Sequence, residues 1–490
     1  MKISIIGAGI GGLATSIRLA AKGYEIHVFE ANNYVGGKLS EIKSSGFRFD
    51  AGPSLFTMPN LLHELFKTSN RKTRKYFEYQ KLNVACKYFY EDNTQITAYT
   101  DSQVFANEIE QKTGVVAQVI INYLAQAKEK YDLTHRIFLE KSLHKWQTYF
   151  SKDVLKALSK IHKLQILENM NDANEKLLKE KHLIQLFNRF ATYNGSNPYK
   201  TPAILCMIPH LEHNLGTFFP KNGMISIPQS LYQLAKDIGV NFHLGEKVKE
   251  IVVEGKKTTG IKRENSAFFA SDIVVSNADI VPTYRYLMPT QKAPERTLQQ
   301  ERSSSALIFY WGINATFEQL DLHNIFFSQH YKAEFKAIFE EFEVYEDPTV
   351  YINISSKYNK KDAPKNCENW FTMINVPHCK NQDWDKIIAV ARQNIIKKLN
   401  RMLKTDIEKL IVCENILDPR GIEQKTSSYL GALYGASSNS RFSAFGRHPN
   451  FSKRIKNLYF CGGSVHPGGG IPLCLLSAKI TSDLIESAHA

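Results

Sequence analysis

The stretch that decides the fold is KISIIGAGIGGLATSIRLAAKGYEIHVFE, residues 2–30. It opens with a short, largely apolar run at residues 3–6, which is typical of a buried parallel strand. Gly7, Gly9 and Gly12 follow as G-x-G-x-x-G, and after them come a helical pattern and then an alternating, strand-like one. This order of strand, glycine turn, helix and strand predicts a Rossmann-type α/β domain.

Each part of this stretch has a task in holding a dinucleotide. Gly7 permits the tight turn, Gly9 lets a pyrophosphate approach the backbone, and Gly12 lets the helix pack closely on the strand. The helix N-terminus adds free N–H groups and a positive dipole end. Glu30, eighteen residues after Gly12, can accept hydrogen bonds from ribose hydroxyls. A glycine-rich turn without a ligand is the alternative.

The composition indicates a globular chain of two or three domains. It has 490 residues, of which 43% are hydrophobic and 11% aromatic. Its seven cysteines are scattered without C-x-x-C spacing, which argues against a zinc site and favours reduced thiols in the cytoplasm. We expect no signal peptide and no spanning helix, because no stretch approaches the roughly 20 apolar residues that one needs.

The net charge of +14 favours an anionic partner or serves solubility alone. No nucleic-acid-binding motif accompanies it. Residues 141–164, KSLHKWQTYFSKDVLKALSKIHKL, contain six lysines and one acid, Asp153. Apolar residues recur there at three- and four-residue spacings, which predicts a basic amphipathic helix, or two with a break near Ser151. Such a segment lies on an anionic bilayer or packs on its own domain.

A second glycine cluster, CGGSVHPGGGIP, occupies residues 461–472. An apolar strand-like run precedes it, and Pro472 stands where the first turn of a helix tolerates proline. The arrangement of strand, glycines and helix N-terminus therefore occurs twice. The second cluster predicts another point where a ligand approaches the backbone.

Several motifs, in order along the chain, resemble the FAD-dependent bacterial carotenoid and phytoene desaturases of the amine oxidase superfamily. They are Glu30 followed by Gly36-Gly37-Lys38, D-x-G-P at 50–53, N-A-D at 277–279, and H-P-G-G-G-I-P at 466–472. The loop ATYNGSNP at 191–198 is nearer the 1-hydroxycarotenoid 3,4-desaturase (methoxyneurosporene dehydrogenase) branch than the phytoene desaturases.

This resemblance implies an α/β fold with two parts. The Rossmann-type FAD-binding domain would be discontinuous, formed by residues 1–70, 216–285 and 416–490. An α+β substrate domain would take residues 71–215 and 286–415. Within it, residues 110–190 would form a helical, basic, membrane-facing region.

The resemblance also implies site residues. His466 would lie beside the flavin, either as a proton acceptor or as a brace for the glycine loop. Arg136, with its neighbour His135, Tyr193 and Trp311 are candidates for contacting the substrate; Trp311 belongs to an aromatic strand that equally suits an ordinary sheet core. No metal ligand is expected. The residues implied to bind FAD are Gly7, Gly9, Gly11, Gly12, Glu30, Gly37, Lys38, Gly52, Pro53, Ser54, Val248, Asn277, Gly463, Gly470 and Ile471.

The implied activity is introduction of a C–C double bond into a carotenoid by hydride transfer to FAD, foremost 3,4-desaturation of a 1-hydroxycarotenoid. Alternatives are a phytoene desaturase, a flavin amine oxidase, and a non-enzymatic flavin-binding protein like the Rab escort relatives of this superfamily. The expected partners are a carotenoid, an anionic membrane surface, and oxygen or a quinone as the final electron acceptor. The expected location is peripheral, on the cytoplasmic membrane.

Overall fold

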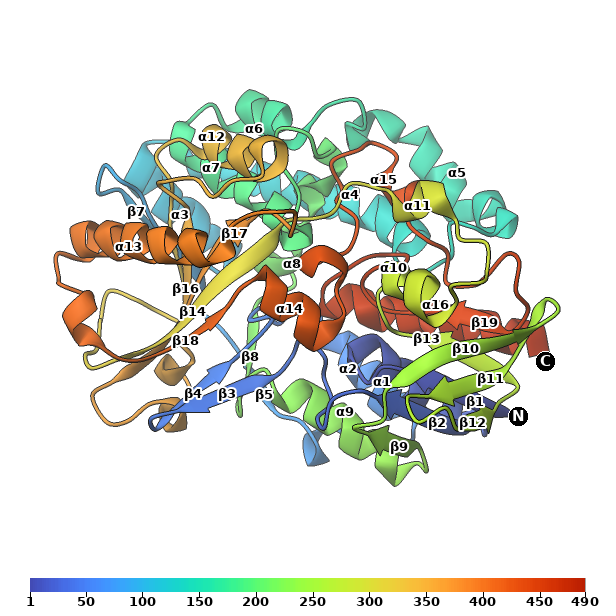
Figure 1. Ribbon diagram of the computed structural model, residues 1–490. Helices are drawn as coiled ribbons and strands as arrows, with labels where there is room; N and C mark the ends of the chain where they lie inside the picture. The colour runs from blue at the N-terminus through green and yellow to red at the C-terminus, as the bar shows by residue number, and fades with distance from the viewer. Residues whose placement is uncertain (490) are drawn as a thin grey trace.

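The apolar run near the N-terminus is the central strand of a parallel sheet in the computed structural model, which describes residues 1–489. The strand order is β19-β13-β1-β2-β9, and every neighbouring pair is parallel (Figure 1). The prediction of a Rossmann-type α/β fold is therefore confirmed. The strands are β1 (Lys2–Ile6), β2 (Glu25–Glu30), β9 (Asn241–Leu244), β13 (Ile273–Ser276) and β19 (Leu458–Phe460).

Both faces of this sheet are covered, as its buried central strands require. One face carries four helices that contact one another, and the other carries a small antiparallel sheet. The helices are α1 (Ile10–Ala20), α2 (Asn60–Thr68), α9 (Ser226–Asp237) and α16 (Ile471–His489). The small sheet consists of β10 (Val248–Glu254), β11 (Lys257–Arg263) and β12 (Phe268–Ala270).

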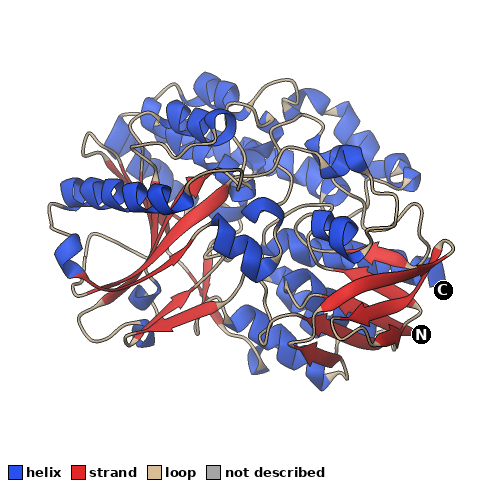
Figure 2. Ribbon diagram, in the orientation of Figure 1, coloured by secondary structure: helices blue, strands red, loops and turns tan. Residues whose placement is uncertain are grey.

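A seven-stranded sheet in the order β18-β14-β17-β16-β15-β6-β7 lies on the opposite side of the molecule from the parallel sheet, at the left in Figure 2. It is antiparallel except between β15 and β6. The long helix α13 (Trp384–Leu403) covers one face of it. The strands are β6 (Val84–Phe89), β7 (Gln95–Tyr99), β14 (Ser305–Ile313), β15 (His323–Phe326), β16 (Val350–Asn353), β17 (Glu368–Val376) and β18 (Ile411–Leu417).

Helices form a layer across the top of both sheets (Figure 2). The basic stretch 141–164 is broken at Ser151, whose backbone is extended. Of the two predicted forms, one continuous helix or two with a break near Ser151, the broken form is therefore present. None of the helices among residues 1–489 combines the length and the hydropathy needed to cross a bilayer. The layer comprises α3 (Ser102–Thr113), α4 (Ala117–Phe138), η2 (Trp146–Phe150), α5 (Lys152–Ser159), η3 (Ile161–Leu164), α6 (Met170–Leu178), α7 (Lys181–Asn188), η4 (Arg189–Asn194), η5 (Ala203–Met207) and α8 (Pro209–His213).

Short elements connect the two sheets. The hairpin of β3 (Glu41–Ser44) and β4 (Phe47–Asp50) packs on the seven-stranded sheet, although residues 1–70 are assigned to the nucleotide domain. A second pair joins β5 (Tyr79–Lys81) to β8 (Phe218–Pro220). The three segments predicted to form the FAD-binding domain, 1–70, 216–285 and 416–490, supply all strands of the parallel sheet. The exact domain boundaries stay a prediction. The remaining elements are η1 (Thr73–Lys75), α10 (Ile280–Pro282), η6 (Thr283–Leu287), α11 (Glu295–Leu298), α12 (Tyr331–Lys336), η7 (Ala337–Glu341), η8 (Ser355–Lys357), η9 (Lys360–Asp362), η10 (Glu408–Leu410), α14 (Pro419–Thr426), η11 (Tyr429–Gly431) and α15 (Ser443–Gly446).

Candidate active site

The first glycine cluster turns the chain from β1 into α1. Gly7 has a φ of +96°, a conformation that favours glycine, and its N–H donates to Phe29 O at 2.7 Å. Gly9 precedes the first helical residue, and no side chain caps the helix there. The N–H groups of this first turn therefore remain available to a ligand.

Gly12 serves packing. A Cβ at this position would lie 2.1 Å from Gly7 O, so helix and strand could not approach as they do. Gly12 is also absent from the cavity lining, whereas Gly7, Gly9 and Gly11 all face the cavity.

The two glycine clusters, more than four hundred residues apart in sequence, lie against each other. A Cβ at Gly11 would be 2.9 Å from Gly462 Cα. Asn277 sits between them, with its side-chain Nδ2 donating to Cys461 O at 3.2 Å. Three distant segments thus meet at the carboxyl edge of the parallel sheet, where open α/β sheets bind ligands.

Glu30 ends β2 as a buried carboxylate that lines the cavity. Its Oε2 accepts from Ala8 N at 2.8 Å, and its Oε1 accepts from Asn32 N at 2.9 Å. These bonds fix its orientation, and each carboxylate oxygen keeps further acceptor capacity for a ribose hydroxyl.

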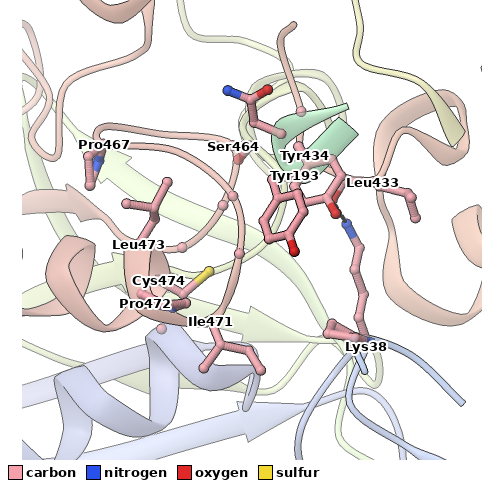
Figure 3. Close-up of a pocket in the computed structure, with 18 of the residues that line it drawn as sticks. Lys38, Tyr193, Leu433, Tyr434, Ser464, Pro467, Ile471, Pro472, Leu473 and Cys474 are labelled. Carbon is pink, nitrogen blue, oxygen red and sulfur yellow. Dashed lines mark hydrogen bonds between the residues drawn. The ribbon is translucent and has the colours of Figure 1, made fainter. Parts of the chain in front are cut away.

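Lys38 is partly buried, and its ammonium reaches the backbone carbonyls of residues 432 and 433. Its Nζ donates to Leu433 O at 2.5 Å and to Ala432 O at 3.4 Å (Figure 3). Burial lowers the pKa of Lys38, and the Asp279 carboxylate works against that shift. Its neighbours Gly36 and Gly37 have positive φ angles, and Gly36 pairs with Gly9, which brings this turn beside the first cluster.

The second glycine run ends at the N-terminus of α16 (Figure 3). A Cβ at Gly469 would lie 2.9 Å from the Tyr434 ring, so this glycine is required by a protein contact. Gly470 has a φ of +108°, and a Cβ there would meet nothing within 4 Å. The backbone at Gly470 therefore borders open space in the cavity, as a site for a flat ring requires.

Glu30, Lys38, Asn277 and the glycines described above other than Gly12 line one cavity of about 1220 Å³. This volume exceeds the ~300–1,000 Å³ usual for a site that holds one small ligand. The cavity opens among exposed apolar side chains, which we name the apolar rim. The apolar rim consists of Tyr149, Leu158, Ile161, Ile166, Leu167, Phe442 and Phe445.

The donor set fits a long dinucleotide such as FAD. The open first turn of α1, the oriented Glu30 carboxylate and the bare backbone at Gly470 all line this one cavity. Except for Gly12, every residue expected from the sequence to bind FAD lines this cavity: Gly7, Gly9, Gly11, Glu30, Gly37, Lys38, Gly52, Pro53, Ser54, Val248, Asn277, Gly463, Gly470 and Ile471.

Comparison with known proteins decides the family. Residues 10–307 match the family model described as flavin containing amine oxidoreductase. The chain is 54% identical over 492 residues to 1-hydroxycarotenoid 3,4-desaturase of Flavobacterium sp. (strain P99-3), covering 100% of both proteins. This chain belongs to the carotenoid desaturase branch of the flavin-containing amine oxidoreductase family. It is accordingly an FAD-dependent oxidoreductase, and the sequence-based expectation of this family is confirmed.

More distant relatives agree with this assignment. This chain is 30% identical to 4,4'-diaponeurosporene oxygenase of Staphylococcus aureus (strain MSSA476), and the match covers 100% of this chain and 98% of the relative. Putrescine oxidase bound to putrescine has the same fold, with a TM-score of 0.64, 13% identity and 99% coverage of both chains.

His466 lies in the wall of the desaturase cavity, and only 1% of its surface is exposed. Its Nε2 donates to Lys141 O at 2.9 Å, so Nδ1 is the unprotonated nitrogen, and Nδ1 has no partner among the described residues. Burial lowers the pKa of His466 to about 4. The imidazole is therefore neutral at neutral pH, and it ties the glycine run to the segment that leads to the apolar rim.

Arg136 does not reach the cavity, which corrects one predicted substrate contact. The residues of α4 that line the cavity are Tyr131, Thr134, Ile137 and Phe138, and Arg136 projects from a different face of the helix. Its side chain is 66% exposed and lies 4.0 Å from Asp153. Its neighbour His135 stacks on Tyr131 outside the lining.

Trp311 is also outside the desaturase cavity. Side chains alternate between the faces of a strand. On β14, Ala306 and Ile308 line the cavity, whereas Leu307, Phe309 and Trp311 pack in the core beneath α13. The indole Nε1 of Trp311 donates to Glu414 Oε2 at 2.6 Å. The ordinary sheet-core interpretation of this strand is therefore the correct one for Trp311.

Tyr193 does line the cavity, together with polar residues that the sequence did not single out. These are Arg189, Tyr331, Tyr351 and Tyr434. A charged residue inside an otherwise apolar helical pattern, as in LFNRFATY at 186–193, was the available signal for Arg189.

Proposed function

We propose that this desaturase introduces the 3,4 double bond of a 1-hydroxycarotenoid while bound peripherally to a membrane. The observation that carries the proposal is the full-length match at 54% identity, joined to a single cavity that runs from both glycine clusters to the apolar rim. A relative named for this reaction and a cavity shaped for a long apolar chain support the same substrate class.

The cavity wall beyond the glycine run suits a polyene. It is built from apolar side chains of η5 and of the seven-stranded sheet, including Leu205, Ile308, Phe371 and Met373. Such a wall excludes water and holds the chain in one orientation beside the site expected for the flavin. Holding the reacting bond in place is a major part of the catalysis that a protein can supply.

FAD, when bound, supplies the acceptor for the hydride taken from the substrate. Gly7 to Gly11 and Glu30 would hold its dinucleotide part, and the backbone around Gly470 would border its ring. The N-terminus of α16 provides free N–H groups at that point, which favour negative charge.

The substrate must also lose a proton. The positive charge left on a polyene is delocalised, so a weak base suffices. His466 lies in the cavity wall, its unprotonated Nδ1 has no hydrogen-bond partner among residues 1–489, and its low pKa makes it a weak base. We assign it first a bracing role through Lys141 O, with proton acceptance as the alternative.

Membrane contact is supported by the apolar rim and its surroundings. Trp146, Phe150 and Leu155, next to the rim, are 68%, 80% and 66% exposed. Six lysines, at positions 141, 145, 152, 156, 160 and 163, accompany this surface. An apolar surface bordered by lysines is suited to the interface of an anionic bilayer, where a carotenoid would enter directly through the rim.

We also propose a cytoplasmic position on the membrane and oxygen or a quinone as the final electron acceptor. All seven cysteines are unpaired, which is consistent with a reducing compartment.

The test uses the FAD-loaded protein in liposomes with a 1-hydroxylated carotenoid and, in parallel, with phytoene. A red shift of absorption with the hydroxylated substrate alone supports the proposal, because one more conjugated double bond lengthens the chromophore. A new chromophore from phytoene alone would indicate a phytoene desaturase. No spectral change with either, while an amine is oxidised, would indicate an amine oxidase. A product that contains added oxygen would indicate an oxygenase.

A further inference from the structure

A buried charge lies in the wall of the apolar cavity. Arg189 begins η4, directly after α7, and only 6% of its surface is exposed, yet it borders the cavity. A guanidinium stays charged in a protein, so its burial is costly unless its donors are engaged. Its partners therefore indicate what the position is built to hold.

Three polar side chains fix the guanidinium. Nη2 donates to Tyr88 Oη at 2.6 Å and to the Glu212 carboxylate at 3.3 Å. Nη1 donates to Tyr193 Oη at 3.3 Å. The rings of Tyr88, Phe190 and Tyr193 surround it at 4.5 to 5.2 Å. Arg189 is thus held rigidly, and Tyr193 is the partner of this set that itself lines the cavity.

Tyr193 has a proton to donate. Its Oη accepts from Arg189, and among residues 1–489 no further hydrogen bond to that oxygen is found. An arginine donating to a phenol oxygen polarises it and makes its own O–H a stronger donor. Tyr331, which packs with Tyr88 on the ring of Phe327, is a second tyrosine that lines the same cavity.

This polar group lies close to the glycine run at α16. Gly195, two residues after Tyr193, approaches Tyr434 so closely that a Cβ would be 2.8 Å from the ring. The other edge of the same ring lies against Gly469, where a Cβ would be 2.9 Å from it. Arg189 and its partners Tyr88 and Glu212 are buried and Tyr193 is partly buried, whereas the residues of the apolar rim are exposed, so the cluster lies at the inner part of the cavity.

The proposed substrate has a matching polar group at a matching place. In a 1-hydroxycarotenoid, only C2 separates the hydroxyl-bearing carbon from the 3,4 bond. The hydroxyl oxygen therefore lies on the order of 4 Å from C3, from ordinary bond lengths. A group that binds this hydroxyl must lie just beyond the reacting bond, with the remaining chain extending toward the rim.

We propose that Arg189 and Tyr193 form the binding subsite for the C1 hydroxyl of the substrate. This inference rests on the proposed function and deepens it. Tyr193 donates to the hydroxyl oxygen, and Arg189 holds and polarises Tyr193. The hydroxylated end enters first and sets which bond lies beside the glycine run, while the unmodified end remains toward the membrane.

The experiment compares Tyr193→Phe with the wild-type holoenzyme on a 1-hydroxylated carotenoid and on its non-hydroxylated parent. Two readouts are used: equilibrium binding by quenching of flavin fluorescence, and steady-state kinetics with KM and kcat separated. We expect Tyr193→Phe to weaken binding of the hydroxylated carotenoid roughly tenfold, as loss of one charge-supported hydrogen bond predicts. Binding of the parent hydrocarbon should not change.

Tyr123→Phe is the matched control. Tyr123 is a buried tyrosine of the same helical core, donates to Asn174 Oδ1 at 2.8 Å, and lies outside the cavity lining. We expect this variant to keep the wild-type preference. The double variant Arg189→Met/Glu212→Gln removes the buried charge of both partners and should lose the preference while retaining FAD.

Two results overturn the inference in different ways. If the wild type prefers the hydroxylated carotenoid and both Tyr193→Phe and the double variant keep that preference, the subsite is wrong while the proposed function stands. If the wild type binds the hydroxylated carotenoid no better than its parent and desaturates only other substrates, the proposed function fails and the subsite with it.

Discussion

Gly469 and Gly470 are neighbours that lack a side chain for different reasons. At Gly469 a Cβ would overlap the Tyr434 ring, so the protein itself requires the glycine. At Gly470 the backbone has a positive φ and open space beside it. Glycine content alone therefore does not indicate ligand contact, and the same distinction applies to Gly9 and Gly12 in the first cluster.

Substitution of Gly9 and of Gly12 should distinguish a glycine needed for FAD binding from one needed for packing. A Cβ at Gly12 would lie 2.1 Å from Gly7 O, a backbone atom, so Gly12→Ala should lower the free energy of unfolding by roughly 1–3 kcal/mol. At Gly9 the nearest atom is the movable Oδ1 of Asn277 at 2.9 Å. Gly9→Ala should leave the unfolding of the FAD-free protein nearly unchanged and lower FAD affinity about tenfold or more, because the methyl group obstructs the pyrophosphate. Urea unfolding and flavin titration measure the two effects. Equal loss of stability in both variants would contradict this assignment.

His466 can be tested by keeping its hydrogen bond and removing its titration. In His466→Gln the amide nitrogen can still donate to Lys141 O, but no side-chain nitrogen accepts a proton. We expect turnover within about threefold of wild type, because a bracing role needs only that donor. His466→Ala should lose more, with weaker FAD retention. A large loss of kcat in His466→Gln with FAD fully bound would instead establish proton acceptance.

At the scale of elements, the stretch 141–164 contributes both to the exposed apolar surface and to the border of the cavity. Its 3-10 turn and its helix carry exposed apolar side chains outward, while Tyr149, Leu158 and Ile161 of the same stretch border the cavity. Phe442 and Phe445 at α15 complete the opening from a segment almost three hundred residues later. The entry to the cavity and the most exposed apolar surface therefore coincide.

Changing the apolar rim should reduce membrane binding without affecting the fold. Leu167 and Phe442 are 73% and 75% exposed, so Leu167→Ser/Phe442→Ser removes few internal contacts. Each side chain is worth about 1.5–3 kcal/mol when buried, so partition into anionic vesicles should weaken roughly tenfold or more. Flotation with vesicles measures this.

The matched control changes apolar residues that are exposed elsewhere. Phe268 on β12 and Val412 on β18 are 51% and 52% exposed and lie outside the cavity lining. Phe268→Ser/Val412→Ser should float as the wild type does. Equal effects of the two double variants would mean that general surface hydrophobicity, not the rim, governs binding.

Elements that depend on residues close together in sequence were predictable, whereas the face that each element turns toward the cavity was not. The G-x-G-x-x-G turn, the break at Ser151 and the glycine run before α16 follow from residues close together in sequence. Trp311 and Arg136 failed because each depends on which face of its element meets the cavity, which distant partners decide: α13 for the strand of Trp311, and the packing of α4 for Arg136. Arg189 was missed because its partners Tyr88 and Glu212 come from other elements.

On the scale of the whole molecule, the two sheets share one cavity but meet through few regular elements. The β3–β4 hairpin, the β5–β8 pair and the contact of Lys38 with the backbone at 432–433 cross between them. Both the expected flavin site and the proposed hydroxyl subsite need this relative placement. Stability of the folded chain and alignment of substrate with cofactor are therefore coupled.

Buried histidines make this stability depend on pH. Burial lowers the pKa of His213, His378, His448 and His466 to about 4 and that of His323 to about 3. Between pH 6.5 and 4 the unfolded chain binds protons at these histidines while the folded chain does not. The free energy of unfolding then falls as pH falls, by about 1.4 kcal/mol per pH unit for each histidine.

Buried carboxyls act in the opposite direction, because burial raises the pKa of Glu334 to about 7 and also raises the pKa of Glu212, Asp362 and Asp483, so the folded chain keeps these protons to higher pH than the unfolded chain does. The five histidines outnumber these carboxyls, so we expect the urea midpoint of the FAD-loaded protein to fall from pH 7 to pH 5. His466→Gln removes one of the five, so below pH 6.5 the free energy of unfolding of this variant should depend on pH less steeply than that of the wild type, by about 1.4 kcal/mol per pH unit. A midpoint that stays level or rises over this range would mean that the histidines become protonated without unfolding. Solvent would then reach the cavity wall around His466, and the dry cavity on which the proposed chemistry depends would be lost.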